Sequence, residues 1–83
     1  MTVEEIKQIN PEALICDGFD DAIIGIAERI NLNSVIVYDV AKIISILIDR
    51  YGMTYDEAEE YYNYNILGAW LGDNTPIYVR TQN

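Results

Sequence analysis

The sequence contains no histidine, a single cysteine and only five lysine and arginine residues. Without histidine it lacks an imidazole general base, a Ser–His or Cys–His pair and a histidine metal ligand. One cysteine, Cys16, excludes an internal disulfide bond and a cysteine-rich zinc site. Its acidic neighbours disfavour a thiolate, so Cys16 is interpreted as a small buried side chain. The scarcity of basic residues argues against direct binding to nucleic acid or to an anionic membrane surface.

Long hydrophobic runs are missing as well. The longest apolar stretches fall far short of the roughly 20 residues that a membrane-spanning helix needs. The first residues contain Glu4 and Glu5 but no basic region ahead of an apolar segment, so no signal peptide is predicted. The glycines are scattered and form neither a phosphate-binding loop nor a dinucleotide turn, so we expect no cofactor. Together these absences predict a cytoplasmic protein.

What the sequence does contain is acidic and hydrophobic. Fourteen acidic residues against five basic ones give a net charge of −9, and 51% of the residues are hydrophobic. That hydrophobic share is too high for a disordered acidic tail. A length of 83 residues predicts a single domain, residues 1–83, with a small core and little room for a substrate cleft. We therefore expect a folded acidic domain that is not an enzyme.

Capping signals predict three helices. In each case a residue with a short side-chain oxygen precedes a segment of helical periodicity, where it can accept a hydrogen bond from a free backbone N–H. The predicted helices are 3–9, which begins with a Thr2–Glu5 capping box and ends at Asn10-Pro11; 40–51, between Asp39 and Gly52; and 54–67, which begins with a Thr54–Glu57 capping box.

Short β-branched and apolar runs predict four strands, at 13–16, 22–27, 35–38 and 77–79. A hairpin loop is expected at residues 17–21, where Asp17-Gly18 favours a turn. A helix over 21–30 is the alternative to the second strand, although Gly25 disfavours it.

The predicted order of elements is helix, strand, strand, strand, helix, helix, strand. This order favours an α+β fold, in which a small antiparallel sheet of about four strands is covered on one face by a helical pair. We expect the last strand to return to the sheet after the helical pair.

Several blocks of the sequence resemble a family of small uncharacterised bacteriophage proteins. The blocks are 17–26 (DGFDDAIIGI), Tyr38-Asp39, 52–58 (GMTYDEA), 65–70 (NILGAW) and Thr75-Pro76. The likeness extends from Cys16 to Val79, about three quarters of the chain. It implies a phage source and expression in the cytoplasm of a bacterial host. It implies no activity and no functional residues.

Acidic and tyrosine side chains are interleaved in the third predicted helix. The predicted partner-binding residues are Asp56, Glu57, Glu59, Glu60, Tyr61 and Tyr64. Tyrosine offers a large rigid contact area and is enriched at protein interfaces. Surface carboxylates can occupy a basic groove as phosphates would. The alternative is a solvated helix face with half-buried tyrosines.

Three carboxylates, Asp17, Asp20 and Asp21, lie within five residues of one another, and Mg²⁺ and Ca²⁺ prefer such oxygen ligands. Their spacing does not match an EF-hand loop, so a solvated turn is the favoured interpretation and no metal site is predicted. Phe19 in the same loop either packs into the core or anchors a partner. Trp70 either covers the small core or belongs to an interface.

Three functions of different classes follow. The favoured hypothesis is a small acidic phage accessory protein that binds and inhibits a host protein, such as a nuclease or an antiviral defence component with a basic groove. One alternative is a homo-oligomeric carrier, or sponge, for a small ligand. The other is a metal-dependent hydrolase built on Asp17, Asp20 and Asp21. Because so small a core leaves apolar side chains uncovered, a homodimer is also expected.

Overall fold

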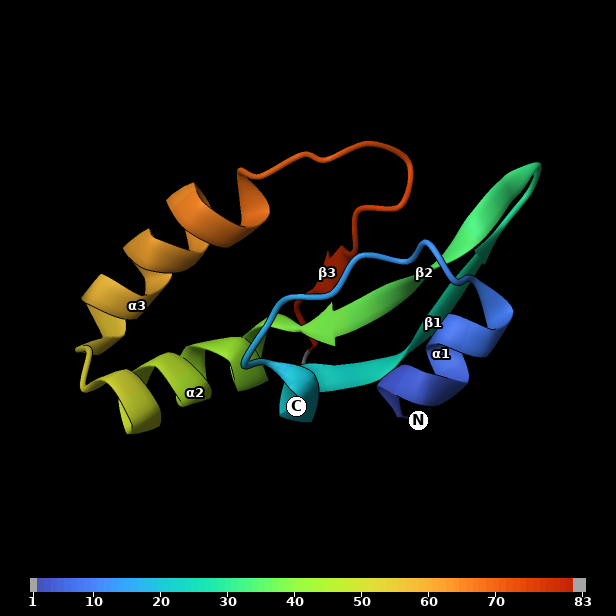
Figure 1. The fold of residues 1–83 in the computed structure, drawn as a ribbon. Helices are drawn as coiled ribbons and strands as arrows, with labels where there is room; N and C mark the ends of the chain where they lie inside the picture. The colour runs from blue at the N-terminus through green and yellow to red at the C-terminus, as the bar shows by residue number, and fades with distance from the viewer. Residues whose placement is uncertain (1, 82–83) are drawn as a thin grey trace.

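The computed structural model describes residues 2–81, and the predicted α+β class is confirmed. In chain order the elements are α1 (Val3–Ile9), the 3₁₀ turn η1 (Asp20–Ala22), β1 (Ile23–Arg29), β2 (Leu32–Asp39), α2 (Val40–Tyr51), α3 (Tyr55–Tyr61), the π-helical turn η2 (Tyr62–Leu67) and β3 (Ile77–Val79). Figure 1 shows α2 and α3 together at one end of an elongated molecule and α1 at the other. Within residues 2–81, no helix has the length and apolar character needed to cross a membrane.

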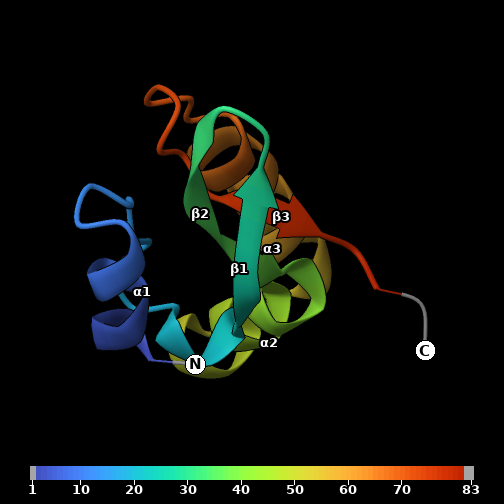
Figure 2. The ribbon, with the colours of Figure 1, turned by 90° about the vertical axis from the view of Figure 1, so that its right-hand side faces the viewer.

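The sheet is mixed and has three strands in the order β1-β2-β3. Strand β1 pairs with β2 antiparallel, whereas β3 pairs with β2 parallel. The prediction of an antiparallel sheet of about four strands is therefore wrong in strand number and in the direction of the last pair. Between β2 and β3 the chain passes through α2, α3 and η2, a long connection of the kind that parallel pairing requires. In Figure 2 these helices lie behind the strands and α1 lies beside them.

Residues 13–16, predicted as a strand, are an extended segment outside the sheet. The Leu14 N–H donates a hydrogen bond to the carbonyl oxygen of Asn74 at 3.2 Å, and the Cys16 N–H donates to the Tyr38 hydroxyl at 2.8 Å. These backbone donors are satisfied by a loop and a side chain, so the segment is held without a strand ladder.

The hairpin of the sheet joins β1 to β2 through Ile30 and Asn31, and not through the predicted loop at 17–21. Asn31 has a φ of 60°, a left-handed conformation that asparagine tolerates better than most residues. Strand β1 confirms the preference for a strand over a helix at 21–30, although both hairpin strands are longer than predicted. Strand β2 begins at Leu32, three residues before the predicted start at residue 35.

The predicted starts of the first two helices are confirmed. The Thr2 hydroxyl accepts a hydrogen bond from the Glu5 N–H, and the Glu5 carboxylate accepts one from the Thr2 N–H, which completes the capping box of α1. The Asp39 carboxylate accepts a hydrogen bond from the Ala41 N–H at the start of α2. Gly52 ends α2 with a φ of 68°, where a side chain would be strained.

The third helix begins with the predicted capping box and ends in a wider π-helical turn. The hydroxyl of Thr54 accepts from the Glu57 N–H, and the Glu57 carboxylate accepts from the Thr54 N–H. Beyond Tyr61 the chain continues as η2 and ends at Gly68, where a Cβ atom would lie 3.1 Å from two backbone carbonyl oxygens. A glycine at this position lets the wide turn close.

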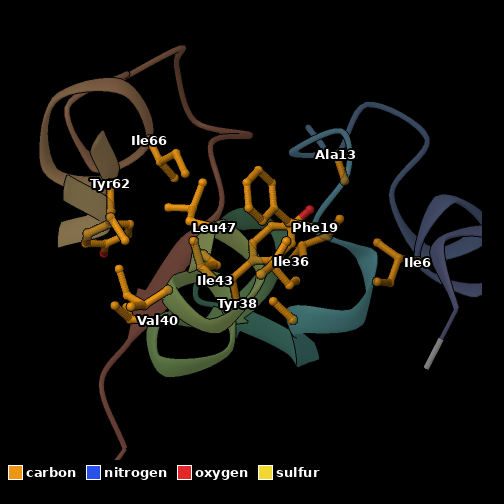
Figure 3. Close-up of a cluster of buried hydrophobic side chains, with 14 residues drawn as sticks. Ile6, Ala13, Phe19, Ile36, Tyr38, Val40, Ile43, Leu47, Tyr62 and Ile66 are labelled. Atoms are coloured by element: carbon orange, nitrogen blue, oxygen red, sulfur yellow. The ribbon is translucent and has the colours of Figure 1, made fainter. Parts of the chain in front are cut away.

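The buried core combines side chains from α1, the segment that leads into η1, η1, β2, α2, α3 and η2, as Figure 3 shows. Its members are apolar or aromatic side chains that solvent scarcely reaches. They include Ile6 from α1, Ala13 and Phe19 from the segment before η1, Ile36 and Tyr38 from β2, Ile43 and Leu47 from α2, and Tyr62 and Ile66 from η2. The segment between α1 and β1 is therefore part of the core, and this packing holds its loop against the helices.

One buried polar side chain joins three parts of the fold. Asn10, which is 4% exposed, donates hydrogen bonds to the Ser34 carbonyl oxygen at 2.8 Å and to the Asn74 side-chain oxygen at 3.0 Å. Its own side-chain oxygen accepts from the Glu12 N–H. These bonds satisfy the buried amide and connect the end of α1 to β2 and to the loop before β3.

Candidate partner-binding groove

Helix α3 and the turn η2 carry acidic and tyrosine side chains on two sides, which have different surroundings. We call the side that meets the C-terminal strand the β3 flank; it carries Tyr55, Glu59 and Tyr62. We call the other side the groove flank; it carries Glu57, Glu60, Tyr61, Tyr64 and Asn65.

On the β3 flank, Glu59 is held in an ion pair. Arg80 donates two hydrogen bonds to the Glu59 carboxylate, at 3.2 and 2.9 Å, and the Tyr55 hydroxyl donates a third at 3.0 Å. The hydrogen bonds from Arg80 lower the pKa of Glu59, while the bond to Glu59 raises the pKa of Tyr55. The Arg80 guanidinium also lies 5.6 Å from the centre of the Tyr62 ring. Glu59 thus has partners within its own chain.

Behind this flank lies a cluster of tyrosines and one thiol. The Tyr78 ring stacks on Tyr38 with centres 5.9 Å apart and meets Tyr62 edge to face at 5.8 Å. The Cys16 sulfur lies 3.2 Å from the Tyr78 hydroxyl oxygen. Burial raises the pKa of Tyr38, Tyr78 and Cys16. All three groups are therefore protonated at neutral pH, and the cluster supplies packing without a thiolate nucleophile.

The groove flank lines an open hollow. Its walls are Met53, Glu57, Glu60, Tyr61, Tyr64 and Asn65. The hydrogen bond from the Thr54 N–H lowers the pKa of the Glu57 carboxylate. Glu57 is therefore charged at neutral pH. Tyr64 is 78% exposed and Tyr61 is 40% exposed. Two carboxylates and two tyrosine rings thus face solvent on the same wall.

This hollow shares lining residues with two others. One shares Met53 and Tyr61 with it and adds Asp17, Phe19, Leu47 and Tyr51. The other shares Asn65 and is lined mainly by apolar side chains and aliphatic segments: Leu14, Ile15, Cys16, Phe19, Ile66, Ala69, Leu71, Pro76 and Tyr78, together with Asp17 and Thr75. We call these three adjoining hollows together the α3 groove; Glu57 and Glu60 mark its acidic end, and Ile66 and Leu71 its apolar end.

The structure therefore divides the six predicted partner-binding residues. It brings Glu57, Glu60, Tyr61 and Tyr64 together on the groove flank. Glu59 faces the opposite way, toward Arg80. Asp56 is exposed but is not among the residues that line the groove.

The two aromatic residues considered as anchors have opposite surroundings. Phe19 is 7% exposed and packs in the core, so its ring contributes to the floor of the groove and does not project from the loop. Trp70 is 69% exposed and does not cover the core.

The carboxylates of the 17–21 loop do not gather around a common point. Asp21 forms an ion pair with Arg50 at 2.8 Å, and Arg50 also donates to the Gly18 carbonyl oxygen. Asp17 lines the α3 groove, whereas Asp20 lies on a separate hollow beside the start of α1. Across residues 2–81, no three acidic or cysteine side chains are close enough to hold a metal ion.

Reasoning from the sequence missed two residues that shape the site. Arg80 decides which flank of α3 is occupied, yet no local pattern around it predicts a contact with α3. Asn65 joins the two ends of the groove. The only signal for Arg80 in the sequence is that it is one of five basic residues in a chain with fourteen acidic ones, which favours an ion pair with one of them.

Comparison with known proteins adds no relative: no protein-family model, no curated protein and no solved structure matches the chain.

Proposed function

We propose that this protein works by binding another protein and not by catalysis, and that the α3 groove is its contact surface. The partner presents a basic surface to Glu57 and Glu60, with Tyr61 and Tyr64 supplying contact area. In its concrete form the protein is a phage accessory factor that blocks the basic groove of a host nuclease or antiviral defence component. The observation that carries the proposal is the convergence of these four side chains on one open wall.

The charge of the whole chain supports this proposal. A net charge of −9 on so small a body gives a negative potential that attracts a basic surface over a distance and raises the rate of association. Tyrosine is a common hot-spot residue at interfaces because its ring is rigid and its hydroxyl can bond. The groove flank therefore combines long-range attraction with short-range contact area.

The test is a charge reversal at one exposed position. Glu60→Lys places a positive charge on the groove flank, while Glu28→Lys makes the same change on β1, away from the groove. Each variant changes the net charge by +2, so nonspecific effects of charge are matched. We expect Glu60→Lys to weaken partner binding by more than about tenfold and Glu28→Lys to change it little.

The measurement starts with capture of partners from a bacterial lysate on immobilised protein at low and at moderate salt. The captured protein is then purified and its affinity for each variant is determined by calorimetry. Binding that resists salt and is equally strong for both variants would rule out the α3 groove as the contact surface. Turnover of a substrate by the purified protein would contradict the proposal that it acts without catalysis.

A further inference from the structure

The α3 groove changes in chemistry along its length. At one end the exposed wall carries Glu57 and Glu60. At the other end the floor is formed by core side chains, Phe19, Ile66 and Tyr78, which are buried or half-buried. Asn65 lines both ends, so a single bound segment can lie across them. A ligand that fits the whole groove needs positive charge at one end and an apolar side chain at the other.

The apolar end is bounded on one side by the extended segment that failed to join the sheet. The N–H groups of Leu14 and Cys16 are bonded to Asn74 and Tyr38, which keeps this wall in place. On the other side stands Leu71, whose side chain is 70% exposed. A hollow with mainly apolar walls beside a core can receive an apolar side chain from a partner.

The dimensions set the spacing that a partner must have. Glu57 and Ile66 are nine residues apart along α3 and η2, which is at most about 14 Å along the helix axis at about 1.5 Å per residue, because the wider turn of η2 rises less per residue. A partner helix of about ten residues spans that distance, with basic side chains on one turn and an apolar side chain two to three turns away.

We infer that the partner segment is basic and amphipathic: Lys or Arg side chains meet the acidic end, and a large apolar side chain enters the apolar end of the groove. This inference rests on the proposed function and adds the nature of the partner segment. Charge complementarity favours such a segment over a second copy of this chain, because each copy carries a net charge of −9 and its acidic end would be repelled.

Two labelled synthetic peptides test the inference. The first is a lysine-rich peptide of about ten residues that alternates lysine with alanine. The second has the same charge and carries two leucines at one terminus. It is prepared in two forms, one with the leucines at the N-terminus and one with them at the C-terminus, to find the orientation in which the peptide binds. We expect the better leucine peptide to bind at least about tenfold more tightly than the alanine peptide, because burial of one large apolar side chain is worth about that much. Fluorescence anisotropy measures each affinity.

Variants of the protein show which part of the groove causes the tighter binding of the leucine peptide. Leu71→Gln makes the apolar end polar at an exposed position, so folding is spared, and Leu67→Gln is the matched control at an exposed leucine that does not line the groove. We expect Leu71→Gln to reduce the affinity of the leucine peptide to that of the alanine peptide and Leu67→Gln to leave it unchanged. Circular dichroism verifies that both variants are folded.

The outcomes separate the two proposals. Equal, salt-sensitive binding of both peptides that Glu60→Lys removes would overturn the apolar anchor and leave the proposed contact surface intact. Failure of every peptide to bind would overturn the acidic contact surface and the anchor with it. A concentration-dependent dimer in sedimentation experiments that Leu71→Gln dissociates would place a second copy in the groove and overturn a basic partner. Tighter binding of the leucine peptide that is lost in Leu71→Gln but kept in Leu67→Gln supports the inference.

Discussion

The two flanks of α3 carry the same kinds of side chain but differ in what they contact. On the β3 flank, the acid Glu59 and the ring of Tyr62 meet Arg80 and the tyrosine cluster. On the groove flank, Glu60 and Tyr64 face an open hollow. The side chains of one flank contact the rest of the fold, whereas those of the other face solvent, where we propose that a partner binds.

The difference comes from a residue far along the chain. Arg80 stands 21 positions after Glu59 and reaches it only because β3 returns to the sheet beside β2. Buried tyrosines and an ion pair on one side stabilise the domain, whereas the tyrosines on the other side are exposed and available for the proposed association. Comparable residues on one helix can therefore serve stability on one side and binding on the other.

The largest expected effect contrasts two tyrosines that are two positions apart. Tyr62 is 2% exposed and Tyr64 is 78% exposed. We expect Tyr62→Ala to lower the free energy of unfolding by about 3–5 kcal/mol, as for other large buried aromatic side chains. Tyr64→Ala is expected to change it by less than about 0.5 kcal/mol. Urea denaturation followed by circular dichroism measures both, and similar losses in the two variants would remove the distinction between the flanks.

A smaller effect on stability is expected at the N-terminal end of α3, where both flanks begin. Thr54→Ala removes the N-cap of α3 and is expected to lower the free energy of unfolding by about 1 kcal/mol. It also removes the hydrogen bond from the Glu57 N–H to the Thr54 hydroxyl, so Glu57 is held less firmly and partner binding at the groove should weaken. Thr2→Ala removes the corresponding cap of α1 and is the matched control for stability. If Thr2→Ala weakened binding as much, the effect would reflect general stability and not the position of Glu57.

The smallest effect concerns the ion pair and depends on pH. Because the pKa of Glu59 is lowered from an ordinary value near 4.5, its contribution to stability is present above that pH. The contribution is lost as the pH falls through the lowered pKa. We expect Glu59→Gln to cost at most about 1 kcal/mol at pH 7, since the pair is partly exposed, and the difference from the natural protein to vanish in acid.

Glu60→Gln, on the groove flank, is the control for that measurement. We expect it to alter the free energy of unfolding at pH 7 by no more than a few tenths of a kcal/mol, because Glu60 is an exposed surface residue. Urea unfolding at a series of pH values gives both differences. A loss in Glu59→Gln that persists unchanged in acid would show that the ion pair with Arg80 is not its cause.

Features that depend on neighbouring residues were predictable. Thr2, Asp39 and Thr54 begin helices because their side-chain oxygens reach backbone N–H groups two or three positions ahead. Gly52 ends a helix because it can adopt a positive φ. The strand–turn pattern around residues 13–21 was misread, because the hydrogen bonds of that segment go to Tyr38 and Asn74.

For the candidate site, the sequence placed acids and tyrosines on one helix but did not separate its two flanks. Helical periodicity brings Glu57, Glu60, Tyr61 and Tyr64 to one side, which is a local property. The apolar end of the groove was not foreseen, since its walls come from residues near 15 and near 70 that meet only in the folded chain.

By itself the sequence determined the three helix starts and the ends of the first two helices, the excess of negative charge and the absence of histidine-based chemistry, because each follows from composition or from contacts a few residues apart. Only the tertiary structure decided that β3 runs parallel to β2, that Glu59 is paired and Glu60 open, and that the groove has an apolar end. These features depend on which distant segments compete for the same surface. These contacts form only when the whole core packs, and they bring Arg80 to one side of α3 and the 13–19 segment to the other.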